Sequence, residues 1–143
     1  MPLDPAEFPG LREGGYRVTS PEDRRYNCIS WAINDSSRFW WPDRSHFYAW
    51  PRTVARTRTL NAFSEMFREF GFKRCDNATL EAGFEKIALF IDEIGRPLHA
   101  ARQLPSGRWT SKMGMQEDIE HDLHDLEGDA YGRVHAFFRR PST

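Results

Sequence analysis

Residues 86–112 constrain the fold most, because they read as three strands separated by tight reversals. Residues 86–91 (KIALFI) are a nearly continuous apolar run, and residues 92–95 end in a glycine where the chain can turn. Residues 97–104 read as the partner strand, and Pro-Ser-Gly at 105–107 makes a second reversal into residues 108–112. Strands joined by such short turns pair antiparallel. The sequence therefore predicts an antiparallel sheet, with a further strand at 132–138.

Helical spacing of apolar residues marks three other segments. The most regular pattern predicts a helix over 59–70 that ends before Gly71. A shorter pattern behind Asn27 predicts a helix that begins at Cys28, and another predicts a short amphipathic helix over 116–126 closed by Gly128. Ser20-Pro21 is typical of a helix start, so we expect a single turn there.

The remaining segments read as irregular. Residues 1–19 hold three prolines and three glycines, which predicts an irregular N-terminal arm packed against the body. Residues 39–51 combine aromatic residues with two prolines and predict a long loop over one side of the molecule. A chain of 143 residues has the size of one ordinary domain, so we expect a single domain over 1–143.

Composition excludes several classes of protein. Twenty Lys and Arg residues against 21 Asp and Glu give no overall field that would attract nucleic acid or an anionic membrane. The N-terminus lacks the pattern of a signal peptide, and no apolar run reaches the ~18 residues of a membrane span, so we expect a cytoplasmic protein. Two cysteines in dissimilar contexts do not form a disulfide scaffold. Cys75, in a polar turn, is interpreted as structural.

Cys28 is the strongest candidate for chemistry. Asn27 is a good helix N-cap residue, and a cysteine in the first helical turn meets the positive end of the helix dipole, which favours the nucleophilic thiolate. A helix that begins with a cysteine, followed by an antiparallel sheet with a histidine on an early strand, has the chain order of papain-like cysteine hydrolases. We therefore expect His99 to accept the proton of Cys28.

The third member of such a site is left open by the sequence. Ser111 lies on the strand that a hairpin would place beside His99, and it is our first choice. Gln103 and Asp118 are the alternatives. We expect Asn27 or Tyr26 to help bind an oxyanion together with the Cys28 N–H, and the indoles of Trp31, Trp41 and Trp109 to contact substrate.

Three other interpretations compete with these. Cys28 and His99 are each compatible with a purely structural place in a core. Glu120, His121 and His124 share a predicted helix face, but the surrounding acidic residues indicate a solvated surface, and we expect no metal and no cofactor. Trp40, Trp41 and Trp50 with Arg52, Arg56 and Arg58 could hold a single-stranded nucleic acid, although packing of the loop onto the core is the better interpretation.

Residues 26–32 (YNCISWA), 81–90 (EAGFEKIALF), 99–104 (HAARQL) and 107–114 (GRWTSKMG) resemble a family of small uncharacterised bacterial proteins of unknown function. More distantly, the cysteine helix followed by Leu98-His99-Ala100 resembles the NlpC-type branch of the papain-like fold. That branch places its base histidine at the start of the first long strand, where this chain has Glu85-Lys86, and the Asp-Cys-Ser-Gly context of cell-wall peptidases is absent. A peptidoglycan substrate is therefore disfavoured.

The sequence thus predicts an α+β, papain-like (NlpC-type) domain with N-terminal helices packed on a small antiparallel sheet. The function that it favours is a thiol-dependent hydrolase or acyl transferase that acts on an amide or thioester bond of a peptide, amide or protein substrate. The alternative is a non-catalytic binding or interaction module, such as a toxin, effector or immunity-type protein, which would have a protein partner. No membrane or nucleic-acid partner is expected.

Overall fold

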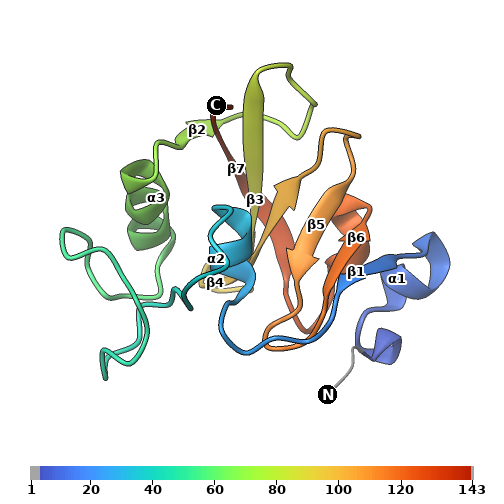
Figure 1. Ribbon diagram of the computed structural model, residues 1–143, viewed down its shortest axis with the longest axis horizontal. Coiled ribbons are helices and arrows are strands. Elements are labelled where there is room, and N and C mark those ends of the chain that lie inside the picture. The colour runs from blue at the N-terminus through green and yellow to red at the C-terminus, as the bar shows by residue number, and fades with distance from the viewer. Residues whose placement is uncertain (1–3, 143) are drawn as a thin grey trace.

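A seven-stranded antiparallel sheet forms the centre of the molecule in the computed structural model, which describes residues 4–142 (Figure 1). The strand order is β1-β6-β5-β4-β3-β7-β2, and every neighbouring pair is antiparallel. The four central strands follow one another along the chain as a meander. The prediction of an α+β fold with an antiparallel sheet is confirmed.

The meander agrees closely with the sequence pattern. Its strands are β3 (Phe84–Ile91), β4 (Pro97–Gln103) and β5 (Trp109–Lys112), and β6 follows at Asp118–His121. The predicted last strand is β7 (Arg133–Pro141), which pairs with β3 along its whole length. Residues 87–91 of β3 are buried because the strand is covered on both faces, which explains why its sequence is a continuous apolar run.

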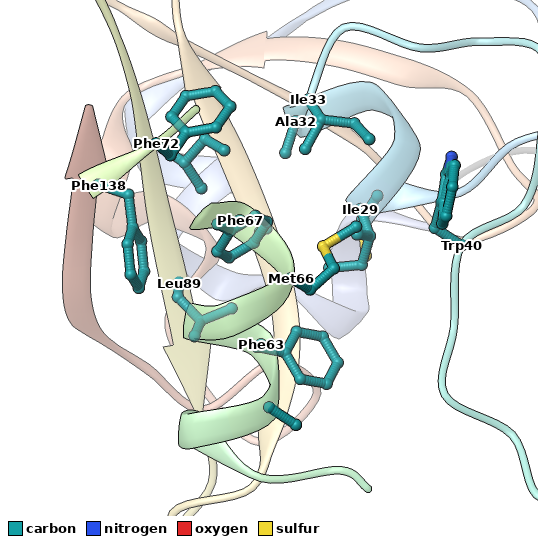
Figure 2. Packing of buried hydrophobic residues seen from close by; sticks show 14 of the residues in the cluster. Ile29, Ala32, Ile33, Trp40, Phe63, Met66, Phe67, Phe72, Leu89 and Phe138 are labelled. Atoms are coloured by element: carbon teal, nitrogen blue, oxygen red, sulfur yellow. The ribbon is translucent and has the colours of Figure 1, made fainter. Parts of the chain in front are cut away.

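Two helices cover one face of the sheet. They are α2 (Cys28–Ala32) and α3 (Leu60–Glu69), which confirms both predictions. Thr59 caps α3 by accepting a hydrogen bond from the backbone N–H of Ala62 at 3.1 Å. Figure 2 shows the side chains that converge from these helices and from the strands to form the first hydrophobic cluster, among them Ile29, Phe63, Met66, Phe67, Leu89 and Phe138.

A second cluster lies on the opposite face. It is covered by the short helices α1 (Pro9–Gly14) and η2 (Leu123–Leu126), and a further short helix, η1 (Pro5–Glu7), precedes α1. The predicted irregular arm is therefore more regular than expected: it contains η1 and α1, and it continues into β1 (Arg17–Ser20), an edge strand that pairs with β6. Phe8 and Leu11 anchor the arm in this cluster.

The predicted helix over 116–126 is wrong. Residues 118–121 are β6, which lies between β5 and β1, and only residues 123–126 are helical. The apolar spacing of Ile119, Leu123 and Leu126 suits a helix, but two neighbouring strands offer the backbone of residues 118–121 a ladder on each side. The single turn expected at Ser20-Pro21 is also absent, because Ser20 ends β1. Cys75 lies in β2 (Lys73–Cys75), an edge strand, instead of a turn.

The aromatic segment between α2 and α3 is irregular, as predicted. Trp40, Trp50 and Val54 are buried in the first cluster, so the segment packs onto the core. Arg56 fixes the loop by donating to the Asp43 carboxylate at 3.0 Å and to the Tyr48 carbonyl at 3.0 Å. Within residues 4–142, no helix has the length and apolar character to cross a membrane.

Candidate active site

Cys28 is the first residue of α2, and a complete capping box holds this end of the helix. The Asn27 carboxamide accepts a hydrogen bond from the Ser30 N–H at 3.2 Å, and the Ser30 hydroxyl accepts one from the Asn27 N–H at 3.2 Å. Asn27 also donates to the carbonyl of Trp40 at 2.8 Å and accepts from its N–H at 3.2 Å, which joins the helix start to the aromatic loop. The position of Cys28 in the first turn is therefore well defined, as predicted.

The thiol lies where β4 and β5 stop pairing. The ladder between these strands comprises only Arg102 opposite Thr110 and Gln103 opposite Trp109. No β4–β5 pair continues the ladder beyond these residues in the described part of the chain, and the N–H of Ala100 lowers the pKa of the Cys28 thiol. Figure 1 shows α2 in front of this part of the sheet. The start of α2 thus fills the gap between the two strands from one face.

On the opposite face, a chain of three buried polar side chains spans the same gap. His99 of β4 contacts Ser111 of β5, with 2.9 Å between Nε2 and Oγ, and Ser111 contacts His121 of β6, with 2.7 Å between Oγ and Nε2. All three residues are 0% exposed. The chain ends where His121 Nδ1 meets the backbone carbonyl of Asp122 at 2.8 Å.

That carbonyl determines the direction of every hydrogen bond in the chain. A carbonyl oxygen only accepts, so the proton of His121 is on Nδ1 and its Nε2 is an acceptor. The Ser111 hydroxyl must then donate to His121, which leaves its oxygen to accept from His99 Nε2–H. His99 Nδ1 is consequently an unprotonated nitrogen, and it is buried without a hydrogen-bond partner in the described part of the chain.

The protonation states agree with this assignment. Burial lowers the pKa of His121 to about 4, and it lowers the pKa of His99 well below its usual 6.5, with a further contribution from the nearby His121. Both rings are neutral at neutral pH. Burial also raises the pKa of the Cys28 thiol to about 11, although the N–H groups of Ala100, Ile29 and Cys28 offset part of the effect.

The expectation of a resting thiolate at Cys28 is therefore wrong. Cys28 is 7% exposed, and α2 is a helix of only five residues, so desolvation of the charged form outweighs the helix dipole. At neutral pH the site contains a neutral thiol and a neutral imidazole.

The structure brings Cys28 and His99 to the same gap without bonding them to each other. Ala100 packs with Cys28 in the first cluster, whereas His99 pairs with Phe90, a residue of the second cluster. Side chains of successive strand residues point to opposite faces. The thiol and the ring thus approach β4 from its two sides, and no hydrogen bond joins them within the described residues.

Among the three candidates for the third group, Ser111 is the one that contacts His99. Gln103 instead donates to the Ala78 carbonyl at 2.8 Å. Asp118 accepts from the Tyr26 hydroxyl at 2.9 Å and from the Thr19 hydroxyl, which places its carboxylate in a separate buried network.

The residues predicted to bind an oxyanion or substrate have other roles in the described state. The side-chain amide of Asn27 is bonded to Ser30 and Trp40, and the hydroxyl of Tyr26 donates to Asp118. Trp31 donates to Thr110 Oγ1 at 2.9 Å and lies under the Arg102 guanidinium. Asn27 and Tyr26 are thus bonded to groups other than Cys28 in the described state.

Trp41 and Trp109 do not line a common cleft with Cys28. The indole of Trp41 packs edge-on against Phe63 on the α3 side of the sheet, whereas Trp109 is buried in the second cluster on the other side. The sheet separates them. The pocket at the aromatic loop, about 570 Å³ and lined by Trp40, Trp50 and three arginines, does not include Cys28 or His99.

Tyr131 is a site residue that sequence reasoning missed. Its ring stacks on the His99 imidazole, with 4.1 Å between the ring centroids and 6° between the planes. Burial raises the pKa of Tyr131, with smaller contributions from the charges of Cys28 and Glu7. No spacing in the sequence links residue 131 to residue 99. The contact of His121 with Ser111 was also missed, because apolar spacing predicts a helix over 116–126. With the alternation of a strand, Ile119 and His121 share one face.

The residues proposed as metal ligands do not come together: within residues 4–142, no group of three His, Cys, Asp or Glu side chains is placed to hold an ion. His121 is buried in the chain with Ser111, while His124 is exposed and pairs with Glu127 at 2.9 Å. The two histidines therefore face different surroundings.

Comparison with known proteins relates the chain to a family of unknown function. No curated protein and no solved structure matches the chain. The family model described as "Domain of unknown function (DUF7689)" matches residues 17–139, a span that contains Cys28, His99, Ser111 and Tyr131 and leaves η1 and α1 outside. Because that span is most of the chain, this protein belongs to the DUF7689 family.

Proposed function

We propose that the chain is a thiol-dependent hydrolase or acyl transferase in which Cys28 attacks an amide or thioester carbonyl and His99 is the base. The observation that carries the proposal is the free Nδ1 of His99. It is an unprotonated ring nitrogen, its ring is held by Ser111, and it belongs to the residue next to the amide that contacts the Cys28 sulfur. A buried basic nitrogen without a partner is costly, and such costs are typical of functional sites.

The reaction follows from these groups. The Cys28 S–H proton passes to His99 Nδ1 as the sulfur forms a bond to the carbonyl carbon, which gives a tetrahedral oxyanion. Collapse of this intermediate breaks the bond to the amine or thiol leaving group, which takes the proton back from His99. Water, or an acceptor amine, then loses a proton to His99 as it attacks the thioester. The bond from the acyl carbon to sulfur breaks, and His99 gives that proton to the departing Cys28 sulfur, which restores the neutral thiol and imidazole.

Ser111 would position the base. When His99 gains a proton at Nδ1 it becomes a cation, and its Nε2–H donates to a serine oxygen that is itself polarised by donation to His121. The backbone N–H groups of Cys28 and Ile29, which lie against the sulfur in the resting state, are available to an oxyanion once the sulfur moves.

The proposal requires the site to open. In the closed state the raised pKa of Cys28 and the lowered pKa of His99 oppose proton transfer, and both shifts arise first from burial. Entry of substrate and water into the β4–β5 gap would reverse both shifts and allow Sγ to approach Nδ1.

We include in the proposal a papain-like (NlpC-type) relationship, supported by the order of cysteine helix, histidine strand and polar residue on the next strand.

Transfer of an acetyl group from p-nitrophenyl acetate tests the proposal without a known substrate. We expect acetylation of Cys28, detected by peptide mass spectrometry, and a loss of about 10²-fold or more in its rate in His99→Gln, because a general base contributes that much. Cys75→Ser is the matched control and should leave the rate unchanged. An equal rate of Cys28 acetylation in His99→Gln would exclude His99 as the base.

The second candidate is a non-catalytic interaction module. It is favoured by the closure of the site, since both Cys28 and His99 are buried in the described state. Under this alternative, Cys28 would be modified only as fast as the whole domain unfolds, and p-nitrophenyl acetate would label Cys75 alone.

A further inference from the structure

Tyr131 lies at the tip of a short closed loop. The N–H of Gly128 donates to the Gly132 carbonyl at 2.9 Å, and the N–H of Gly132 donates to the Gly128 carbonyl at 2.8 Å. Two reciprocal bonds between glycines thus close a loop of residues 128–132. Its tyrosine lies parallel to His99 and covers that ring on the face of the second cluster.

The N-terminal arm also contacts Tyr131. The Phe8 ring packs against the Tyr131 ring at 5.0 Å between centroids, and Phe8 is buried. Helix α1 is seated closely on η2, because a Cβ on Gly14 would come within 2.0 Å of the Asp125 carboxylate. The tyrosine ring therefore contacts both an imidazole of the sheet and a phenyl ring of the arm.

A groove of about 810 Å³ lies beside this loop. It is lined on one side by the β3–β4 turn, including Ile94 and Leu98, and on the other by Asp129, Gly132 and Arg133. Leu98 directly precedes His99, and Asp129 and Gly132 stand on either side of Tyr131 along the chain. The groove thus lies beside the loop that carries Tyr131, although neither His99 nor Tyr131 lines it in the closed state.

We propose that Tyr131 is the gate of the site, that the N-terminal arm latches it shut through Phe8, and that the groove is the path by which substrate reaches His99 when the loop moves. This inference rests on the proposed function, because it concerns access to the same cysteine and histidine. The arm lies outside residues 17–139, the span that the family model matches.

The closed loop is suited to moving as a unit. Two backbone hydrogen bonds hold it together, while its tyrosine makes ring contacts that break without leaving a buried polar group unpaired. Opening also exposes the free Nδ1 of His99 to solvent, which removes the cost of leaving that nitrogen without a partner.

The test measures the rate of Cys28 alkylation by iodoacetamide in the full chain with Cys75→Ser. Tyr131→Ala should raise the rate about tenfold, since one stacked aromatic pair shifts an equilibrium by up to that factor. Phe8→Ala should raise it as well, and Tyr131→Phe, which keeps the ring, should leave it unchanged. Tyr16→Ala removes a half-buried tyrosine of the same cluster that does not contact His99, and it is the matched control.

Acetyl transfer from p-nitrophenyl acetate is measured on the same variants and separates the two proposals. Faster alkylation in Tyr131→Ala and Phe8→Ala without any Cys28 acetylation supports the gate and contradicts the proposed function. Cys28 acetylation that is equal in all variants supports the function and overturns the gate. Alkylation that rises equally in Tyr16→Ala, or in none of the variants, also overturns the gate, and Phe8→Ala decides the question if Tyr131→Ala fails to fold.

Discussion

Substituting His121 by glutamine should flatten the dependence of stability on pH. Burial lowers the pKa of His121 from 6.5 to about 4, so the folded protein binds this proton less readily than the unfolded chain does. Below pH 6.5 the unfolded chain therefore holds more protons, and the free energy of unfolding falls as pH falls from about 6.5 toward 4. Above pH 6.5 both states are neutral at this position and His121 contributes no slope.

The size of the effect follows from the shift. Each pH unit inside the window costs about 1.4 kcal/mol for one group, which amounts to about 2 kcal/mol between pH 8 and pH 5. No discount for solvent applies, because His121 is fully buried. His99, whose pKa is lowered in the same direction, adds to the slope of the wild-type chain.

Urea unfolding followed by tryptophan fluorescence at pH 8 and pH 5 gives the two free energies. We expect the fall between these pH values to be about 2 kcal/mol smaller in His121→Gln than in the wild-type chain. His135→Gln is the control, since His135 is exposed on β7. An equal fall in His121→Gln and the wild-type chain would refute the neutral histidine–serine–histidine chain, because it would mean that His121 takes up its proton equally in both states.

Three further changes test the framework that holds the site. Asn27→Ala should lower the free energy of unfolding by about 2 kcal/mol, because it removes a helix cap and two buried partners, whereas Asn61→Ala on the exposed face of α3 should change it little. Lys112→Met should cost on the order of 3 kcal/mol in urea unfolding, because the buried Lys112 ammonium donates to three backbone carbonyls. Gly132→Ala should lower the thermal stability more than Gly95→Ala, although both glycines have positive φ (71° and 89°). The reason is that a Cβ on Gly132 would lie 1.9 Å from a β3 carbonyl, whereas Gly95 has open space around it. Equal thermal midpoints for the two variants would contradict this close approach.

Sequence patterns located the elements whose burial is regular along the chain, either continuous or on one face. The run at residues 86–91, with a turn on each side of its partner, predicts the meander because a strand covered on both faces must be apolar throughout. The helix at Leu60–Glu69 was predicted from one apolar stripe, which is the face that packs on the sheet. β6 was missed because residues 118–121 are specified by the strands on both sides of them and not by their own alternation.

The candidate site was predicted in part, because local patterns can be recognised in the sequence whereas burial in the whole fold cannot. The cap at Asn27 and the order of Cys28, His99 and Ser111 are local properties, and the structure places all of them at the gap between β4 and β5. Burial is a property of the whole fold, so the raised pKa of the thiol could not be predicted from a short helix alone. Tyr131 comes from a loop whose position depends on how the N-terminal arm packs, which no spacing in the sequence encodes.

The central claim is that Cys28 and His99 act together in a site that opens without unfolding. The rate of Cys28 alkylation by iodoacetamide between pH 5 and pH 11 tests it most directly, measured in Cys75→Ser with and without His99→Gln and compared with the rate of global unfolding under the same conditions. We predict that Cys28 is alkylated faster than the protein unfolds and that its alkylation rate rises near neutral pH. In His99→Gln this rise should disappear, which leaves only the rise set by the thiol pKa of about 11. Modification that keeps pace with unfolding at every pH, whether or not His99 is present, would contradict it and make Cys28 a packing residue.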